Sequence, residues 1–432
     1  MTQDTLGRLM AGQFSDPDGG PALDPLTAAV AIEDSLAGTE AELVAGLDLG
    51  GRLALVADDN TWRVLGARVA AALATIARVV EVRLPGRPHA DGETVEALRR
   101  ETASCDGLIA VGSGSINDIC KYAAALDNKP YAVFATAPSM NGYTSVNAAI
   151  TIHGHKKSIQ AAAAAGVFMD LEVLAAAPPR MIRSGLGDSL CRSTAQADWL
   201  LAHMLLDDPY REAPFALLAE DEKTLFAGSA ALMRGDLDVM RALARVLTLS
   251  GFGMTIARGS QPASQGEHLI GHYAEMRMNP AWPPSFHGEQ IGVATLTMAR
   301  LQARMLADGP PRLVPSAADE ASVIDHFGRD LGAACWAEFK LKRLDTAQAR
   351  ILNQRIDAQW DAIAARIAAI SLPAALLEDV LARAGAAICP QDLGWGSDFY
   401  GGAVIHAREI RNRYTFLDLA ADSGGFDTLG FI

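Results

Sequence analysis

Three short stretches of the chain place an acid and two imidazoles beside glycines, and these side chains could bind a metal ion. The stretches are Gly185–Asp188 (GLGD), Gly266–His268 (GEH) and Phe286–Gly288 (FHG). Catalytic zinc-type sites use about three protein ligands and keep one position open for substrate or water. Upstream, Gly112–Asp118 (GSGSIND) directly follows an apolar run. This order predicts a nucleotide site followed by a metal site, the combination needed for hydride transfer to a carbonyl that a metal polarises.

Two pairs of histidines satisfy the spacing of metal ligands. His268 and His272 are four residues apart and would share one helix face, as in two-histidine zinc sites. The H-E-x-x-H motif is nevertheless absent, because Glu267 precedes the first histidine instead of following it. The other pair is His268 with His287, and Asp188 would supply the carboxylate in either case. Spacing alone leaves His272 and His287 as alternatives for the second imidazole.

The glycine turn is a candidate phosphate site. A strand ending at Val111, followed by two glycines and a helix, directs backbone N–H groups and a helix N-terminus at one point, where a diphosphate can bind. The turn lacks the G-x-G-x-x-G spacing, so a purely structural strand-to-helix turn is the alternative. Asp118 just inside the helix and Thr136–Ser139 after the next strand favour the functional interpretation. Asp58 ends another strand, where it could accept from a ribose hydroxyl, which favours NADH, or simply cap a helix.

Alternating strand and helix patterns predict a Rossmann-like α/β domain over residues 27–180. The expected strands are 52–57, 79–84, 107–111 and 131–135, with helices at 61–76, 94–103 and 116–126 between them. A hairpin around Gly154 and a strand leading to Asp170 follow. Residues 181–432 show mostly helical periods and predict an all-helical domain. Residues 1–26 predict an irregular lead-in.

Composition restricts the class of protein further. A chain of 432 residues with half its residues hydrophobic suits two domains of ordinary size. The net charge of -14 argues against a general nucleic-acid binder. The five cysteines form no C-x-x-C pair, so neither a disulfide framework nor a thiolate zinc site is expected. The N-terminus lacks signal-peptide order, and no uncharged apolar stretch reaches the roughly 20 residues of a membrane span. We therefore expect a cytoplasmic protein with no membrane span.

Five motifs, taken in order, resemble one family. They are Gly112–Asp118, Thr136–Ser145 (TAPSMNGYTS), Gly187–Arg192 (GDSLCR), Gly266–His268 and His287–Gly288. Together they resemble the glycerol-1-phosphate dehydrogenases, within the dehydroquinate synthase-like and iron-containing alcohol dehydrogenase superfamily. The segment Ile410–Asp418 (IRNRYTFLD) is similar to the bacterial branch. The fold implied is a Rossmann-like parallel-sheet domain plus a C-terminal all-helical domain.

The resemblance implies a reaction and a set of site residues. The reaction is the reversible reduction of dihydroxyacetone phosphate by NADH or NADPH to sn-glycerol 1-phosphate, a compound of phospholipid metabolism. Asp188, His268 and His287 would hold one divalent zinc, nickel or iron ion, which leaves His272 to touch substrate and relay a proton. A homodimer or larger oligomer is also implied. The residues expected to contact the dinucleotide are Asp58, Gly112, Gly114, Ser115, Ile116, Asn117, Asp118, Thr136, Ala137, Pro138, Ser139 and Ser145.

One position departs from the family pattern. Asn141 stands where an Asp that contacts substrate is usual, and an amide brings no charge and cannot act as a base. Asn141 is therefore a candidate catalytic residue whose identity makes another phosphorylated or polar ketone an alternative substrate. A dehydroquinate synthase-like lyase that recycles NAD and a non-catalytic nucleotide-binding protein are two further possibilities. The candidates for contacting a substrate phosphate are Lys121, Lys156, Lys157, Arg180 and above all Arg192, one turn after Asp188.

Overall fold

The computed structural model describes residues 4–152 and 154–424, which form two compact units. The α/β unit contains the chain up to Ile152 together with Lys156–Ser189 and Arg211–Ser260. The helical unit contains Leu190–Tyr210 and most of the chain from Gln261 onward. The division differs from the expected single boundary at residue 181. Both the end of the GLGD motif and the helices between 211 and 260 belong to the α/β unit.

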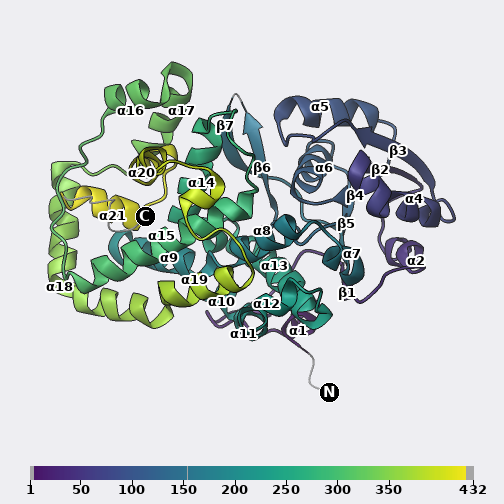
Figure 1. The fold of residues 1–432 in the computed structure, drawn as a ribbon, viewed down its shortest axis with the longest axis horizontal. Coiled ribbons are helices and arrows are strands. Elements are labelled where there is room, and N and C mark those ends of the chain that lie inside the picture. The colour runs from purple at the N-terminus through teal and green to yellow at the C-terminus, as the bar shows by residue number, and fades with distance from the viewer. Residues whose placement is uncertain (1–3, 153, 425–432) are drawn as a thin grey trace. The chain divides into compact units, whose positions relative to one another are not determined.

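A six-stranded parallel sheet forms the centre of the α/β unit (Figure 1). Its strands are β1 (Ala29–Glu33), β2 (Arg52–Asp58), β3 (Arg78–Leu84), β4 (Gly107–Gly112), β5 (Tyr131–Ala135) and β8 (Gly166–Asp170). Their order across the sheet is β1-β8-β5-β4-β2-β3. Strands β2 and β4 are neighbours near the middle of the sheet. From β2 the chain continues to β3 on one side, and from β4 it continues to β5 on the other side. The carboxyl ends of β2 and β4 therefore flank the point where the winding reverses, which is where open sheets bind ligands.

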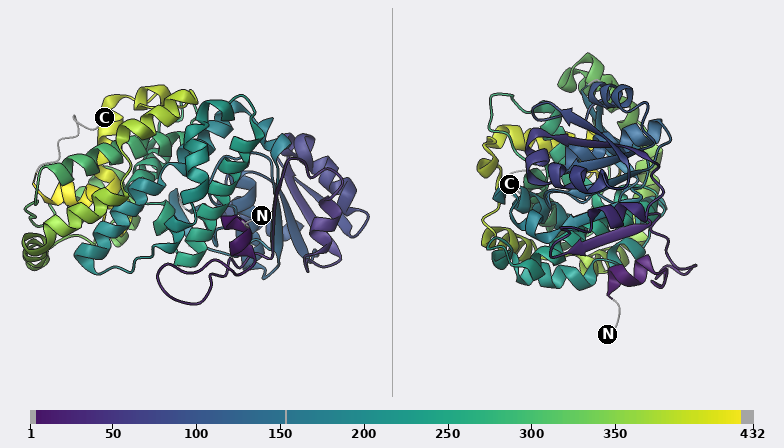
Figure 2. Two further views of the ribbon diagram at one scale, coloured as in Figure 1. Left: turned by 90° about the horizontal axis from the view of Figure 1, so that it is seen from below. Right: turned by 90° about the vertical axis from the view of Figure 1, so that its right-hand side faces the viewer.

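Helices cover both faces of this sheet, as the two views of Figure 2 show. The apolar strands are buried on both sides, which is why they lack the alternating pattern of half-exposed strands. Right-handed crossovers place α2 (Glu40–Ala45) and α4 (Ala67–Leu73) on one face. They place α5 (Gly92–Glu101) and α6 (Gly114–Leu126) on the other. The predicted Rossmann-like sheet is confirmed.

The rest of the α/β unit is helical, apart from the two-stranded ribbon of β6 (Asn147–Ile152) and β7 (His155–Gln160). Its helices are α7 (Leu171–Ala175), α8 (Pro179–Ser189), α10 (Ala213–Ala216), α11 (Ala219–Ala227), α12 (Ser229–Leu232) and α13 (Leu237–Ala257). The apolar helix α13 packs on α7, α8 and β1. This packing explains why residues 211–260 belong to the same unit as the sheet.

The expected lead-in is not irregular throughout. Asp4 caps the start of helix α1 (Thr5–Met10), and its side chain accepts a hydrogen bond from the N–H of Gly7. The hydroxyl of Thr5 donates to Glu220 at 2.6 Å, so α1 is tied to α11. The apolar residues Leu6 and Leu9 are buried, and their burial accounts for the helix in a short segment rich in turn residues.

The helical unit has one continuous hydrophobic core. Its helices are α9 (Arg192–Leu206), α14 (Gly266–Arg277), α15 (His287–Ala307), α16 (Glu320–Phe327), α17 (Arg329–Phe339), α18 (Thr346–Ile370), α19 (Ala374–Arg383), α20 (Ser397–His406) and α21 (Phe416–Asp422). Leu269 and Ile270 of α14 contribute to this core, as does Val293 of α15. The expectation of a helical C-terminal part is confirmed.

Two helical stretches are long and apolar enough by composition to cross a membrane. The first is α13, of whose apolar window 89% is buried within the α/β unit. The second runs from Thr346 to Arg383, with 22% of its window buried. It joins α18 to α19 across Pro373, and its residues Ile363 and Ile367 pack into the helical core. Both helices therefore have packed faces within their units.

Candidate functional site

The glycine turn joins β4 to α6, as the sequence predicts. Helix α6 begins at Gly114 and runs for 13 residues, so its first N–H groups emerge at the carboxyl end of β4. A Cβ on Gly112 would lie 2.6 Å from the Cβ of Ile116, and the helix could then not start so close to the strand. Ile116 and Asn117 are buried beneath the turn. The turn can therefore present backbone donors to a diphosphate, while these two side chains support it from below.

Asp58 ends β2, next to β4 in the sheet. Its Oδ1 accepts hydrogen bonds from the N–H groups of Asn60 and Thr61, both at 2.8 Å, and so caps the next helix. The capping role that the sequence allows is therefore present. Contact with a ribose hydroxyl stays a prediction, for which the place of Asp58 at the carboxyl edge of the sheet is suitable.

The segment after β5 continues this edge. The N–H of Thr136 donates to the carbonyl of Gly112 at 3.1 Å and so extends the pairing of β5 with β4. The hydroxyl of Tyr143 donates to the carbonyl of Ala137 at 2.6 Å. Ser145 is buried, and its Oγ accepts from the N–H of Asn147. These bonds fold residues 136–147 into an ordered loop beside the glycine turn.

Helix α8 packs directly on this loop through the GLGD motif. The hydroxyl of Ser184 donates to the carbonyl of Ser139 at 3.1 Å. The N–H of Asn141 donates to Oδ2 of Asp188 at 2.8 Å. Between them, a Cβ on Gly185 would lie 1.6 Å from the carbonyl oxygen of Pro138. The first glycine of the motif is thus explained by close approach of a helix to a backbone.

Asn141 offers a hydrogen-bond donor inside this loop. Its side chain is 8% exposed, and no described residue accepts from its Nδ2. A buried amide nitrogen without a protein acceptor is a natural contact for an oxygen atom of a bound ligand. A substrate contact at Asn141 stays a prediction, and the amide would serve there as a donor, which a carboxylate cannot do.

The buried side chain of Lys121 on α6 is hydrogen-bonded to the loop of residues 136–147. Its ammonium group, fully buried, donates to the carbonyls of Gly142 at 2.6 Å and Asn147 at 3.0 Å. Oδ1 of Asp118 lies 3.8 Å away. The structure therefore gives Lys121 a structural role instead of the phosphate contact considered from the sequence.

This burial predicts a pH dependence of stability. Burial lowers the pKa of Lys121 from 10.5 to about 8, although the charge of Asp118 opposes the shift. Between these values the folded protein binds fewer protons than the unfolded chain, so stability rises with pH. We expect the free energy of unfolding to rise by on the order of 3 kcal/mol more in the wild type than in Lys121→Met over this range. Urea unfolding at several pH values measures it, and equal slopes for both proteins would contradict the prediction.

Three imidazoles gather in the helical unit. His268 and His272 lie on α14, and His287 is the first residue of α15. The ring centroids are 5.2 Å apart for His268 and His287, 5.8 Å for His272 and His287, and 5.9 Å for His268 and His272. The first two histidines are buried and His287 is partly exposed. The structure thus brings together both histidines predicted as ligands and the one predicted to touch substrate.

Carboxylates and a thiol lie beside these rings. The potential ligand atoms of His272, Glu275 and His287 are within 4.8 Å of one another, and so are those of Cys191, Glu267 and His268. Imidazoles with a nearby carboxylate suit zinc, iron or nickel. The donor chemistry of the cluster therefore fits a divalent ion. Glu267 and Glu275 were not predicted, although residues 268, 272 and 275 have the spacing of one helix face.

One buried carboxylate accepts hydrogen bonds from three helices of the helical unit, α14, α15 and α21. Asp198 of α9, fully buried, accepts hydrogen bonds from the N–H groups of Gly266 at 2.9 Å and Phe416 at 2.9 Å. It also accepts from Nε2 of Gln302 at 3.1 Å. The first turn of α14, helix α15 and the start of α21 therefore share one acceptor, which fixes where α14 begins.

Two sequence predictions near the GLGD motif need correction. Asp188 stands near the end of α8 and belongs to the α/β unit, although the expected helical domain, residues 181–432, included it. Arg192 begins a different helix, α9, and therefore shares no helix face with Asp188. Its Nη1 donates to Gln196. The phosphate contact proposed for Arg192 loses the geometric reason given for it.

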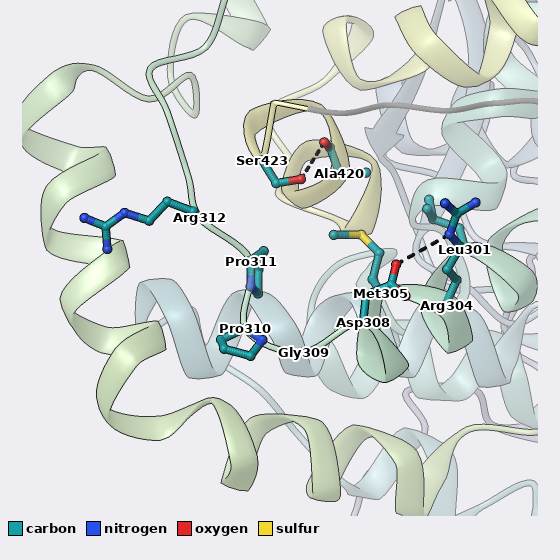
Figure 3. A pocket seen from close by; sticks show the side chains of 10 residues that line it. All are labelled: Leu301, Arg304, Met305, Asp308, Gly309, Pro310, Pro311, Arg312, Ala420 and Ser423. Carbon is teal, nitrogen blue, oxygen red and sulfur yellow. Dashed lines mark hydrogen bonds and ion pairs between the residues drawn. The ribbon is translucent and has the colours of Figure 1, made fainter.

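A separate cavity of about 230 Å³ lies elsewhere in the helical unit (Figure 3). Figure 3 shows Arg304 facing Asp308, whose side chains are 3.5 Å apart, while Arg312 points away from them. Leu301, Met305 and the segment Gly309–Pro311 complete much of its wall. None of its lining residues belongs to the predicted nucleotide or metal sets.

Comparisons with known proteins agree with this architecture. A family model described as iron-containing alcohol dehydrogenase matches residues 31–178. The glycerol-1-phosphate dehydrogenase [NAD(P)+] of Bacillus velezensis is 30% identical over 377 residues, covering 84% of each chain. The enzyme of that name from Geobacillus stearothermophilus is 30% identical over 385 residues, covering 85% of each chain. An iron-containing alcohol dehydrogenase from Corynebacterium glutamicum has a similar fold, with a TM-score of 0.59 over 95% of this chain and 94% of that one, at 16% identity.

The family model described as iron-containing alcohol dehydrogenase thus matches the part of the chain that holds the parallel sheet, and the fold resembles that of a protein of this description. Relatives that match over more than four fifths of both chains identify the family. The chain belongs to the glycerol-1-phosphate dehydrogenase family.

Proposed function

We propose that the chain is a metal- and NAD(P)-dependent dehydrogenase that interconverts dihydroxyacetone phosphate and sn-glycerol 1-phosphate. The observation that carries the proposal is the gathering of His268, His272 and His287 in a chain that also has a glycine turn at the reversal point of a parallel sheet. Family membership supports the phosphorylated substrate, because the relatives are named for it.

We assign the ion to Asp188, His268 and His287. When bound, a divalent ion stabilises the negative charge that develops on the ketone oxygen. Bound NADH would supply the hydride that reduces the carbonyl carbon, and a group of this chain would give the oxygen the proton that completes the alcohol. His272 is the residue proposed to supply that proton, since imidazole exchanges protons near neutral pH.

The nucleotide is assigned to the glycine turn and to residues 136–145. The N-terminus of α6 would receive the diphosphate and Asp58 a ribose hydroxyl, which favours NADH because a 2′-phosphate would meet a carboxylate. Asn141 would donate its Nδ2 hydrogen to an oxygen atom of the substrate. We also propose that the protein is cytoplasmic and forms a homodimer or larger oligomer, which light scattering measures.

The test follows NADH absorbance with dihydroxyacetone phosphate, using protein stripped of metal and reloaded with single divalent ions. We expect oxidation only after reloading, and the most active ion identifies the metal. In the reverse direction, sn-glycerol 1-phosphate should be oxidised and sn-glycerol 3-phosphate should not. Folded protein that binds NADH but oxidises none with any ion would contradict the proposal. Tightly held NAD without net turnover of NADH would favour the recycling lyase.

A further inference from the structure

Both histidines assigned to the ion have a carboxylate at the same ring nitrogen. Nδ1 of His268 lies 3.0 Å from Oε1 of Glu267, and Nδ1 of His287 lies 3.2 Å from Oε1 of Glu275. Both glutamates belong to α14, eight residues apart and so roughly two turns along the helix. One helix therefore supplies a partner to an imidazole of its own and to an imidazole at the start of α15.

Glu267 is held tightly in place. Its side chain is fully buried. Oε1 also accepts from the N–H of Gln265 at 2.8 Å, and Oε2 accepts from the hydroxyl of Thr194 at 3.1 Å. The charge of Arg413 lies within electrostatic range. These partners restrict the orientation of the Glu267 carboxylate, and Nδ1 of His268 lies against it.

Glu275 has a more open setting. Its side chain is 21% exposed, and that of His287 is 30% exposed. Arg411 places a positive charge within electrostatic range of this carboxylate. The segment Ile410–Asp418, which the sequence marks as similar to the bacterial branch, thus places one arginine near each of the two glutamates.

We propose that Glu267 and Glu275 are positioning residues that select the tautomer of His268 and His287. A neutral imidazole has one N–H and one lone pair. A carboxylate that accepts from Nδ1 leaves the lone pair on Nε2 of both rings for the ion and makes each ring a better donor. The inference rests on the metal site of the proposed function, and it adds two residues that set metal affinity without touching the ion.

The test compares Glu267→Gln, Glu275→Gln and the double variant with Glu289→Gln. Glu289 is the matched control because its Oε2 accepts from the N–H of Phe286, so this carboxylate lies beside His287 in sequence but caps the helix. Affinity for Zn²⁺ is measured by competition with a chromophoric chelator, without substrate or nucleotide. Each single change is expected to weaken binding by roughly 10- to 100-fold, as for other outer-shell partners. The control should bind as the wild type does.

Two spectroscopic measurements complete the test. The absorption bands of bound Co²⁺ should keep their shape in Glu275→Gln, since no ligand is lost; a changed coordination number would make Glu275 a ligand and overturn the proposal. In the wild type with Zn²⁺, ¹⁵N NMR of labelled histidine should show two rings protonated at Nδ1 and ligated through Nε2. This readout needs no variant, so it holds even if a glutamine variant fails to fold.

The outcomes separate this inference from the proposed function. Wild-type Zn²⁺ affinity in both glutamine variants, or ligation through Nδ1, would overturn the positioning role even in an active dehydrogenase. Weakened affinity with Nε2 ligation would support it even if dihydroxyacetone phosphate proved not to be the substrate.

Discussion

Replacing His287 with alanine is expected to abolish metal retention and to lower kcat by about 1,000-fold or more. His287 is the first residue of α15, and its ring stands 5.2 Å from that of His268. A divalent ion contributes several kcal/mol of charge stabilisation in the transition state, and each 1.4 kcal/mol is about tenfold in rate. Metal content after gel filtration and NADH oxidation are the measurements.

His203→Ala is the matched control for this experiment. His203 lies on α9 of the same unit, its Nδ1 is 2.7 Å from the carbonyl of Asp208, and it belongs to none of the potential ligand groups of the described residues. This variant should keep both metal and turnover. His272→Asn should retain metal but lose turnover, as expected of a residue that serves the substrate. Full metal occupancy and full activity in His287→Ala would show that the ligand assignment is wrong.

Gly185→Ala is expected to give the largest effect on the α/β unit. The new Cβ would meet the carbonyl oxygen of Pro138 at 1.6 Å and its carbonyl carbon at 2.7 Å. Because these atoms belong to a backbone, no side-chain rotation relieves the clash, and either α8 or residues 136–141 must move. We expect a loss of about 3 kcal/mol or more in the free energy of unfolding, together with weaker NADH binding.

Gly92→Ala is the control for this substitution. Gly92 begins α5 in the same unit, and a Cβ there would have no neighbour within 4 Å. Its effect on stability should stay within about 0.5 kcal/mol, as is usual for surface changes. Urea unfolding and the fluorescence of bound NADH measure the two properties. If both glycine variants behaved alike, the close approach of α8 to the loop would not be the reason for the glycine.

The strands were predictable because burial on both faces leaves continuous apolar runs in β2, β4 and β5. The points at which helices are interrupted were less predictable from the sequence. The expected helix 61–76 is interrupted by a π-helical turn at Trp62–Gly66, where Arg83 stacks on the Trp62 ring at 3.5 Å. In the region of helical periods after residue 181, helices α11 and α12 are separated at Gly228, and a Cβ there would lie 2.5 Å from Cγ2 of Val239. Arg83 and Val239, which lie beside these two interruptions, belong to other elements, and local periodicity does not include such neighbours.

The same distinction applies to the candidate site. His268 and His287 were predicted from sequence, the second through resemblance, and the structure brings their rings together. The roles inferred for Glu267 and Lys121 depend on bonds that form only after folding. The assignment of residues 211–260 to the α/β unit likewise depends on the burial of α13 in that unit, which is a tertiary effect.

Asp198 also bears on the order in which the helical unit assembles. This carboxylate accepts from the N–H of Gly266, where the histidine helix α14 begins, and from the N–H of Phe416, which lies 218 residues from it in the sequence. Contacts between residues so far apart carry the entropy cost of closing a long loop, so they form late in folding. We therefore expect α14 to acquire its final anchor late, and its histidines to meet their ion in a unit that has already folded.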